Sequence, residues 1–126
     1  MVESSPVEGN PGFRVDPVAG VDRRDGSVVV RLAGELDLYN AQDVRQALLA
    51  CTEAQPDRLV VDLSGVEFID STVLGVLIEA RSRMAERQAF MLAAPGTETS
   101  RALAISGLDR HFGVHPTVDE ALAAEL

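Results

Sequence analysis

The chain contains no lysine, and this absence removes several kinds of chemistry at once. All 11 of its cationic side chains are arginines. Schiff-base catalysis and phosphate binding by a Walker lysine both depend on a lysine amine, so enzymes of these kinds are excluded. A hydrolase is also unsupported, because there is no Gly-x-Ser-x-Gly motif and the candidate bases are only His111 and His115. Both lie near Pro116 and outside any expected helix, so we expect no metal site there.

Cysteine and long apolar runs are scarce as well. Cys51 is the single cysteine, which excludes a disulfide within the chain, and the apolar residues before it favour a buried thiol. No apolar run approaches the roughly 18 residues that span a bilayer. Residues 1–6 lack the basic and then apolar pattern of a signal peptide. We therefore expect a cytoplasmic protein.

Positive charge is in short supply. The 11 arginines are outnumbered by 20 acidic residues, which gives a formal net charge of −9. Nucleic acids and anionic membranes are bound through clustered cations, which this composition does not offer. We expect neither of them among the partners of the chain.

The hydrophobic content fits one small domain. The chain has 126 residues, of which 46% are hydrophobic, enough for a single core. Residues 1–12 mix proline, glycine, serine and glutamate without periodicity, which predicts a disordered N-terminal tail. Residues 13–126 then form the domain.

Strand and helix patterns alternate along this domain. Apolar, β-branched runs predict strands at 13–18, 27–34, 59–63, 89–93 and 112–114. Helical spacing and capping residues predict helices at about 40–52, from Thr72 onward, from Thr97 to Gly107, and after Thr117. The polar residues 20–26 predict a turn that joins the first two strands into an antiparallel hairpin. The later strands alternate with helices and should pair in parallel, so we expect an α/β domain with a mixed sheet of about four to five strands and about four helices.

Two helix starts carry recognisable caps. Asn40 with Asp43, and Thr117 with Glu120, have the spacing of a capping box.

The segment 59–78 reads as a buried strand, a short loop and a helix. The apolar run to Leu63 predicts the strand, and Ser64 and Gly65 predict that it ends at the surface. Asp70 or Ser71 can cap the helix that follows. Four residues at helical spacing should pack inward: Val73, Val76, Leu77 and Ala80.

Two short segments in this order of elements resemble the STAS domain of anti-sigma factor antagonists. They are Gly34-Glu35-Leu36-Asp37 and Phe68-Ile69-Asp70-Ser71-Thr72, and the resemblance extends over about 13–126. The family often has glycine where this chain has Val73. Gly75 still leaves a position without a side chain, where a partner backbone can approach.

The resemblance implies a binding protein without a cofactor or catalytic activity of its own. In the family, the serine after the aspartate is phosphorylated by an anti-sigma factor that is itself a serine kinase, and here that serine is Ser71. The unphosphorylated form binds the kinase and releases a sigma factor. Phosphorylation turns the antagonist off, and a phosphatase acting on phospho-Ser71 restores it.

We expect the partner-binding surface to combine two loops with the start of the helix. Its residues are Asp37, Tyr39, Asn40, Asp70, Ser71, Thr72, Leu74 and Gly75. Leu74 and Ile78 should lie on a strip beside the inward face, open to solvent or to a partner.

Simpler explanations exist for the same residues. Ser71 is of an ordinary capping type. Leu74 and Ile78 can be core residues beneath a neighbouring helix. Asp37 and Asn40 suit a local turn and a cap. The alternative function is that of a structural STAS subunit in a transporter or stress-sensing complex, although the short single domain favours a free-standing regulator.

Overall fold

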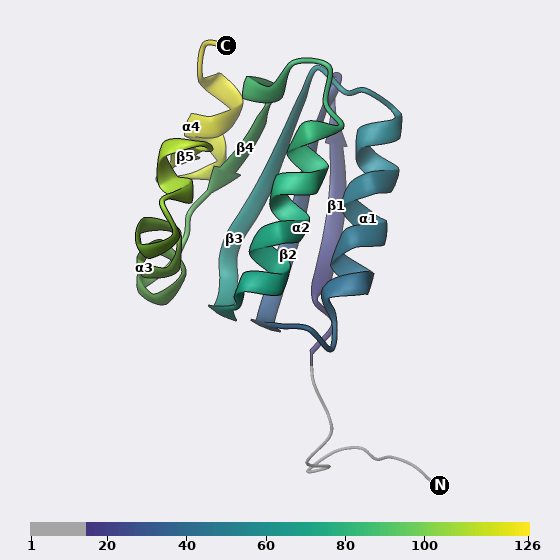
Figure 1. Cartoon of the computed structure of the whole chain (residues 1–126). Helices are drawn as coiled ribbons and strands as arrows, with labels where there is room; N and C mark the ends of the chain where they lie inside the picture. The colour runs from purple at the N-terminus through teal and green to yellow at the C-terminus, as the bar shows by residue number, and fades with distance from the viewer. Residues whose placement is uncertain (1–14) are drawn as a thin grey trace, which may run out of the picture.

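The computed structural model describes residues 15–126, which form a five-stranded mixed sheet flanked by helices (Figure 1). The strands are β1 (Val18–Arg24), β2 (Ser27–Leu36), β3 (Arg58–Ile69), β4 (Phe90–Ala93) and β5 (Gly113–His115). The helices are α1 (Ala41–Glu53), α2 (Ser71–Ser82), α3 (Thr97–Ser106) and α4 (Val118–Ala123), with the 3-10 turns η1 (Arg87–Ala89) and η2 (Leu108–Arg110). This order confirms the predicted fold class. The predicted tail, residues 1–12, lies outside the described residues.

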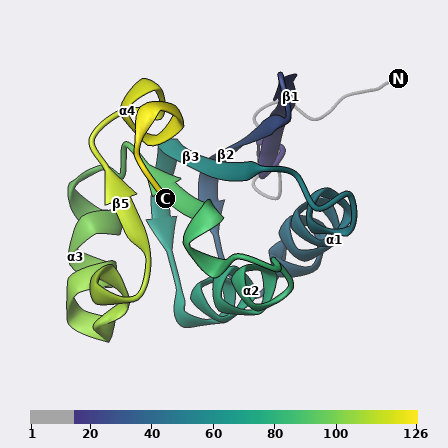
Figure 2. The same cartoon turned by 90° about the horizontal axis from the view of Figure 1, so that it is seen from above.

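The strands lie in the sheet in their sequence order, β1 to β5. The first pair is antiparallel and the other three pairs are parallel, as expected for strands joined by helices. Figure 2 shows α1 and α2 together on one face of the sheet and α4 on the opposite face, with α3 beside the β5 end.

The first strand lies later in the chain than predicted. β1 covers most of the segment expected to be a turn, and the turn consists of Asp25 and Gly26, with φ values of 49° and 87°. Positive φ at both central residues gives the tight hairpin turn that matches the twist of the strands. The hairpin itself is confirmed. The strand prediction for 13–18 is wrong for residues 15–17 and right for Val18, and residues 13 and 14 lie outside the described range.

The prediction that the central strand ends at Ser64 and Gly65 is also wrong. β3 continues to Ile69, and the register with β2 shifts where Arg31 and Ala33 pair with Asp62 and Gly65. This shift is a bulge with an extra residue in β3, and the backbone N–H of Ser64 donates to the Asp62 carboxylate across 2.9 Å. Turn-forming residues thus bend the strand here without ending it.

Each face of the sheet has its own core. The larger core lies beneath α1 and α2 and includes Cys51, where burial raises the pKa of the thiol. The predicted buried cysteine is confirmed, at 3% exposure. The smaller core packs Val29, Val60 and Met91 against α4, and Arg58 fixes this helix by donating to the carbonyl of Ala121 across 2.7 Å.

The face of the sheet that α4 covers is polar at β1. Asp22 pairs across the sheet with Val29, a residue of the smaller core, and so points to this face. Its carboxylate lies 3.6 Å from Arg31 and 3.8 Å from Arg24. No helix among residues 15–126 is long and apolar enough to span a membrane.

An ion pair clamps α1 to α2. The guanidinium of Arg45 donates to both carboxylate oxygens of Glu79, each across 2.8 Å, and Arg83 adds a longer contact of 3.3 Å. These hydrogen bonds, chiefly that from Arg45, lower the pKa of Glu79 below its ordinary value of 4.5.

We predict that Glu79→Gln lowers the melting temperature near neutral pH and that the difference from wild type closes in acid. A carboxyl whose pKa is lowered by folding stabilises the folded state above its unfolded pKa, here 4.5, and loses this effect as the pH falls through the folded value. Thermal unfolding at several pH values measures the difference. Glu53→Gln, at an exposed position of α1, is the control and should show no such closure.

Candidate functional site

Ser71 is the first residue of α2, and its side chain is exposed. Asp70 provides the helix cap, because one carboxylate oxygen accepts from the backbone N–H groups of Thr72 and Val73, across 3.0 and 3.2 Å. Within residues 15–126, the Ser71 hydroxyl makes no hydrogen bond of its own. The simpler explanation of Ser71 as the cap is therefore wrong, since the neighbouring aspartate has that role.

The loop between β2 and α1 is held by its own polar side chains. The Asn40 amide donates to the carbonyl of Glu35 across 2.8 Å, and its oxygen accepts from the N–H of Asp37 across 3.0 Å. The Asp37 carboxylate accepts from the N–H of Tyr39. Asn40 occupies the N-cap position of α1 but makes no capping bond with its side chain, so the predicted capping box with Asp43 is wrong.

At the second predicted capping box, the helix cap by Thr117 is confirmed. Thr117 precedes α4, and its hydroxyl accepts from the N–H of Glu120 across 3.0 Å.

The β2–α1 loop and the start of α2 lie at one edge of the sheet, as predicted. Glu35 and Leu36 at the end of β2 pair in parallel with Phe68 and Ile69 at the end of β3. The N–H of Asp70 then donates to the carbonyl of Leu36 across 3.0 Å. Both segments therefore leave the sheet side by side, which brings the two motifs of the sequence together.

The predicted inner face of α2 is confirmed. Of the two residues expected to lie exposed beside it, one is exposed and the other is buried. Val73, Val76, Leu77 and Ala80 are buried. Leu74 is only 7% exposed and belongs to the larger core, so the expectation that it lies open to solvent or to a partner is wrong. The larger core thus extends beyond the inner face of α2 to a residue on the side of the helix. Ile78 is 47% exposed, as expected.

Gly75 lies on the exposed side of α2. A β-carbon added there would meet no atom within 4 Å, so the fold gives no steric reason for glycine. Glycine inside a helix costs roughly 1 kcal/mol relative to alanine. The missing side chain is thus a cost to the fold, and it leaves the backbone close to the surface.

We predict that Gly75→Ala raises the free energy of unfolding by about 0.5–1 kcal/mol, because alanine fits the helix and restricts the unfolded chain. Urea denaturation measures the change. Gly107→Ala is the matched control and should destabilise the protein, since Gly107 ends α3 with a φ of 78°.

The predicted binding surface did not include two exposed apolar residues of this edge. Leu38, in the β2–α1 loop, is 63% exposed, and Phe68, near the end of β3, is 50% exposed. Tyr39, which was predicted, is 82% exposed. A signal was present in the sequence, because Leu38 and Tyr39 are adjacent large residues in a polar loop. Phe68 gave none, because the strand was predicted to end at Ser64 and Gly65, which placed Phe68 in the short loop before the helix.

The chemistry available at this edge is that of an exposed hydroxyl beside a carboxylate. A free serine hydroxyl stands next to the Asp70 carboxylate, which is already used as a cap. Among residues 15–126 there is no cluster of three or more side chains suited to a metal ion. An exposed serine hydroxyl is chemically able to accept a phosphoryl group.

Comparison with known proteins identifies the family. Residues 19–121 match the STAS domain. This chain belongs to the STAS domain family. The resemblance seen in the two short motifs is thereby confirmed over most of the domain.

Similar proteins are anti-sigma factor antagonists. RsfB of Mycobacterium tuberculosis, an anti-sigma-F factor antagonist, is 33% identical over 98 residues, which cover 78% of this chain and 80% of the relative. RsfA of the same organism, also an anti-sigma-F factor antagonist, is 30% identical over 110 residues, covering 84% and 85%. The crystal structure of an anti-sigma factor antagonist from Mycobacterium paratuberculosis superposes with a TM-score of 0.77 at 34% identity, covering 88% of this chain and 91% of the other.

Proposed function

We propose that this STAS domain is an anti-sigma factor antagonist controlled by phosphorylation of Ser71. In its unmodified form it binds an anti-sigma factor that is a serine kinase, and the bound sigma factor is released. The kinase transfers the γ-phosphoryl group of ATP to the Ser71 hydroxyl, with ADP as the other product, and the complex then separates. A phosphatase acting on phospho-Ser71 returns the chain to its binding form.

One observation carries this proposal. The Ser71 hydroxyl is exposed at the start of α2, is not used in capping, and lies at the edge where the β2–α1 loop emerges. An acceptor for a kinase must be reachable, and the same hydroxyl must lie within a surface large enough to bind the kinase. The exposure of Ser71 supports the first condition, and the exposed Leu38, Tyr39 and Phe68 support the second.

The proposed binding surface has an exposed layer and a supporting layer. Asp37, Tyr39, Ser71, Thr72 and Gly75 would contact the kinase directly. Asp70, Asn40 and Leu74 would support them from below, through the helix cap, the loop hydrogen bonds and the core. Acidic side chains at this edge favour basic groups on the kinase.

Charge explains how phosphate would act as an off-switch. A helix N-terminus stabilises an anion by about 0.3–1 kcal/mol, so the modified protein should remain folded. Docking would bury nearly two negative charges beside the Asp70 carboxylate, and an unpaired buried charge costs several kcal/mol. At about 4 kcal/mol, affinity would fall roughly a thousandfold. The loss at the interface therefore exceeds the gain at the helix.

The proposal places the chain in the cytoplasm, where ATP and sigma factors are available, and requires no catalysis by the chain itself. The alternative of a structural STAS subunit would not require a kinase that modifies Ser71.

We predict that one of the anti-sigma factor kinases of the source organism, incubated with ATP and the chain, adds a single phosphate at Ser71. Mass spectrometry of the intact protein and of its peptides measures this. Ser71→Ala should accept none, whereas Thr72→Val should still be modified. Modification of Ser71→Ala, or no modification of wild type by any of these kinases, would contradict the proposal.

We also predict that Ser71→Asp binds the same kinase at least about tenfold more weakly than wild type in calorimetry, because one buried negative charge costs more than a kcal/mol. Ser71→Asn has the same shape without the charge and should lose much less affinity. Circular dichroism should be unchanged for both. Equal affinities of the Asp and Asn variants would show that charge is not the cause.

A further inference from the structure

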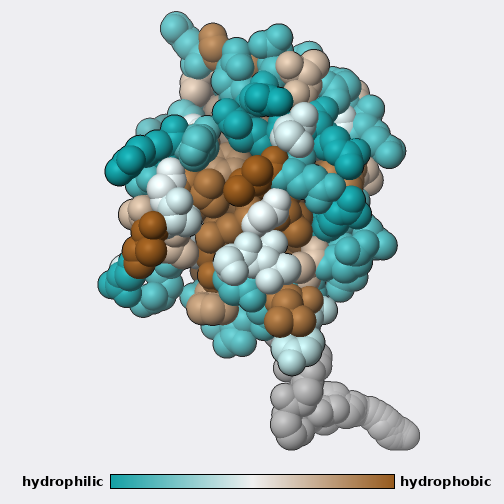
Figure 3. Space-filling model, viewed as in Figure 1, coloured by the Kyte–Doolittle hydropathy of each residue, from teal (hydrophilic) through white to brown (hydrophobic). Residues whose placement is uncertain are grey.

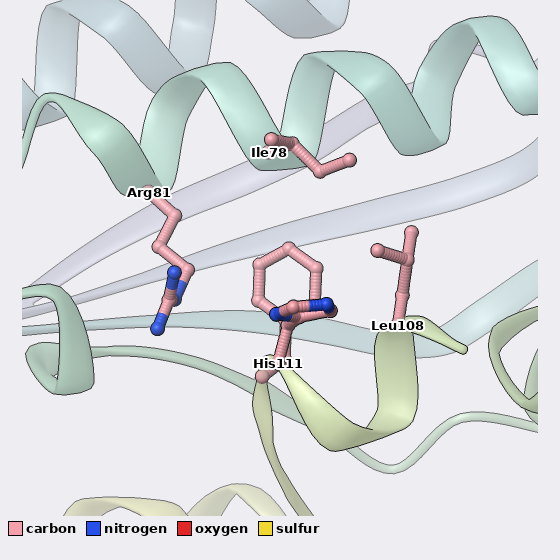
Figure 4. Close-up of a pocket in the computed structure, with 5 residues that line it drawn as sticks. Ile78, Arg81, Leu108 and His111 are labelled. Carbon is pink, nitrogen blue, oxygen red and sulfur yellow. The ribbon is translucent and has the colours of Figure 1, made fainter. Parts of the chain in front are cut away.

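A groove lies between α2 and the turn η2, away from the Ser71 edge. It is lined by Ile78, Arg81, Leu108, His111 and Phe112 and has a volume of about 130 Å³. In Figure 4, Ile78 and Arg81 project from α2 toward Leu108 and His111 of the η2 segment. An apolar cavity of about 150 Å³ in another protein holds benzene. The groove therefore has room for one aliphatic or aromatic side chain.

The floor and the rim of the groove differ in chemistry. Phe112 forms the floor, is 4% exposed, and is held by the ring of Phe90 at a centroid distance of 5.9 Å. The Arg81 guanidinium lies 5.8 Å from the centroid of the Phe112 ring, and His111 is exposed. An apolar floor next to an arginine suits an apolar side chain that has a carboxylate nearby.

The groove continues the exposed face of α2 that begins at Ser71. Ser71, Gly75 and Ile78 recur at helical spacing, and all three are exposed. Figure 3 shows hydrophobic surface gathered in the middle of this side of the molecule, over the region of α2, with hydrophilic residues around it. An apolar patch with a polar rim is typical of a protein-binding surface.

We propose that this groove is a second anchor for the kinase that docks at Ser71 and that it receives an apolar side chain of the kinase with an acidic residue beside it. This inference rests on the proposed function. The chain carries a net charge of −9, and Arg81 places a positive charge at the groove that an acidic group can recognise. Ile78 follows Ser71 by seven positions in the helix, about 10 Å at roughly 1.5 Å per residue, so a single interface of ordinary size can include both.

The test uses the kinase that phosphorylates Ser71 of the wild-type chain. Ile78→Asp and Arg81→Glu should each weaken its binding about tenfold or more in calorimetry, as expected for residues at the centre of a contact. Ile105→Asp is the matched control, because Ile105 is 80% exposed on α3 and does not line the groove. Its affinity should stay within about twofold of wild type. Circular dichroism checks the fold of each variant. If Ile78→Asp unfolds, the kinase affinity of Arg81→Glu alone tests the proposal.

The outcomes separate this inference from the proposed function. If wild type is bound and phosphorylated while Ile78→Asp and Arg81→Glu bind equally well, the groove proposal is overturned and the function stands. If no kinase binds or modifies wild type, both are overturned. Light scattering tests whether a second copy of the chain occupies the groove. If the wild type self-associates, Ile78→Asp abolishes this association and the kinase affinity is unchanged, the groove is assigned to a second copy and the proposal is overturned.

Discussion

The parallel pairing of β2 with β3 is the constraint on which the site depends. It carries Glu35 and Leu36 to the same edge as Phe68 and Ile69, and the hydrogen bond from Asp70 N–H to the Leu36 carbonyl extends the pairing one step beyond the strands. Without this contact, the β2–α1 loop and the start of α2 would be unrelated parts of the chain. With it, segments separated by a whole helix form one surface, and the first turn of α2 has a fixed direction.

The helix α2 has two different faces. Its inner face, with Val73 and Leu77, is part of the larger core and is clamped to α1 by Arg45 and Glu79. Its outer face carries Ser71, Gly75 and Ile78, which contribute little to the fold. A rigid inner face means that a phosphate on the outer face would change charge and not shape. Regulation of this kind needs no conformational transition.

The sequence predicts the elements of this fold better than their limits. Alternating strands and helices, the hairpin, and the inner face of α2 follow from periodicity, which is a local property. The end of the central strand was predicted wrongly at Ser64 and Gly65, because such residues occur both in turns and in bulges. Only the pairing with β2 distinguishes the two. The prediction for Leu74 failed because the extent of a core depends on tertiary packing, which no local pattern contains. Asn40 has the right residue type for a cap, but its side-chain oxygen already accepts from the N–H of Asp37. The Ser71 edge was predictable because two motifs at strand ends pointed to it; the α2–η2 groove was not, since its walls come from segments far apart in sequence.

The charges of the first hairpin have a consequence for the behaviour of the molecule in concentrated solution. β1 is the outermost strand, and the edge of a sheet can recruit a strand from another molecule and start aggregation. Asp22, with Arg24 and Arg31 on either side, places a charged network next to that edge. Such a network must be desolvated before a strand of another molecule can add, which disfavours polymerisation through β1. Each molecule therefore stays available to its binding partner.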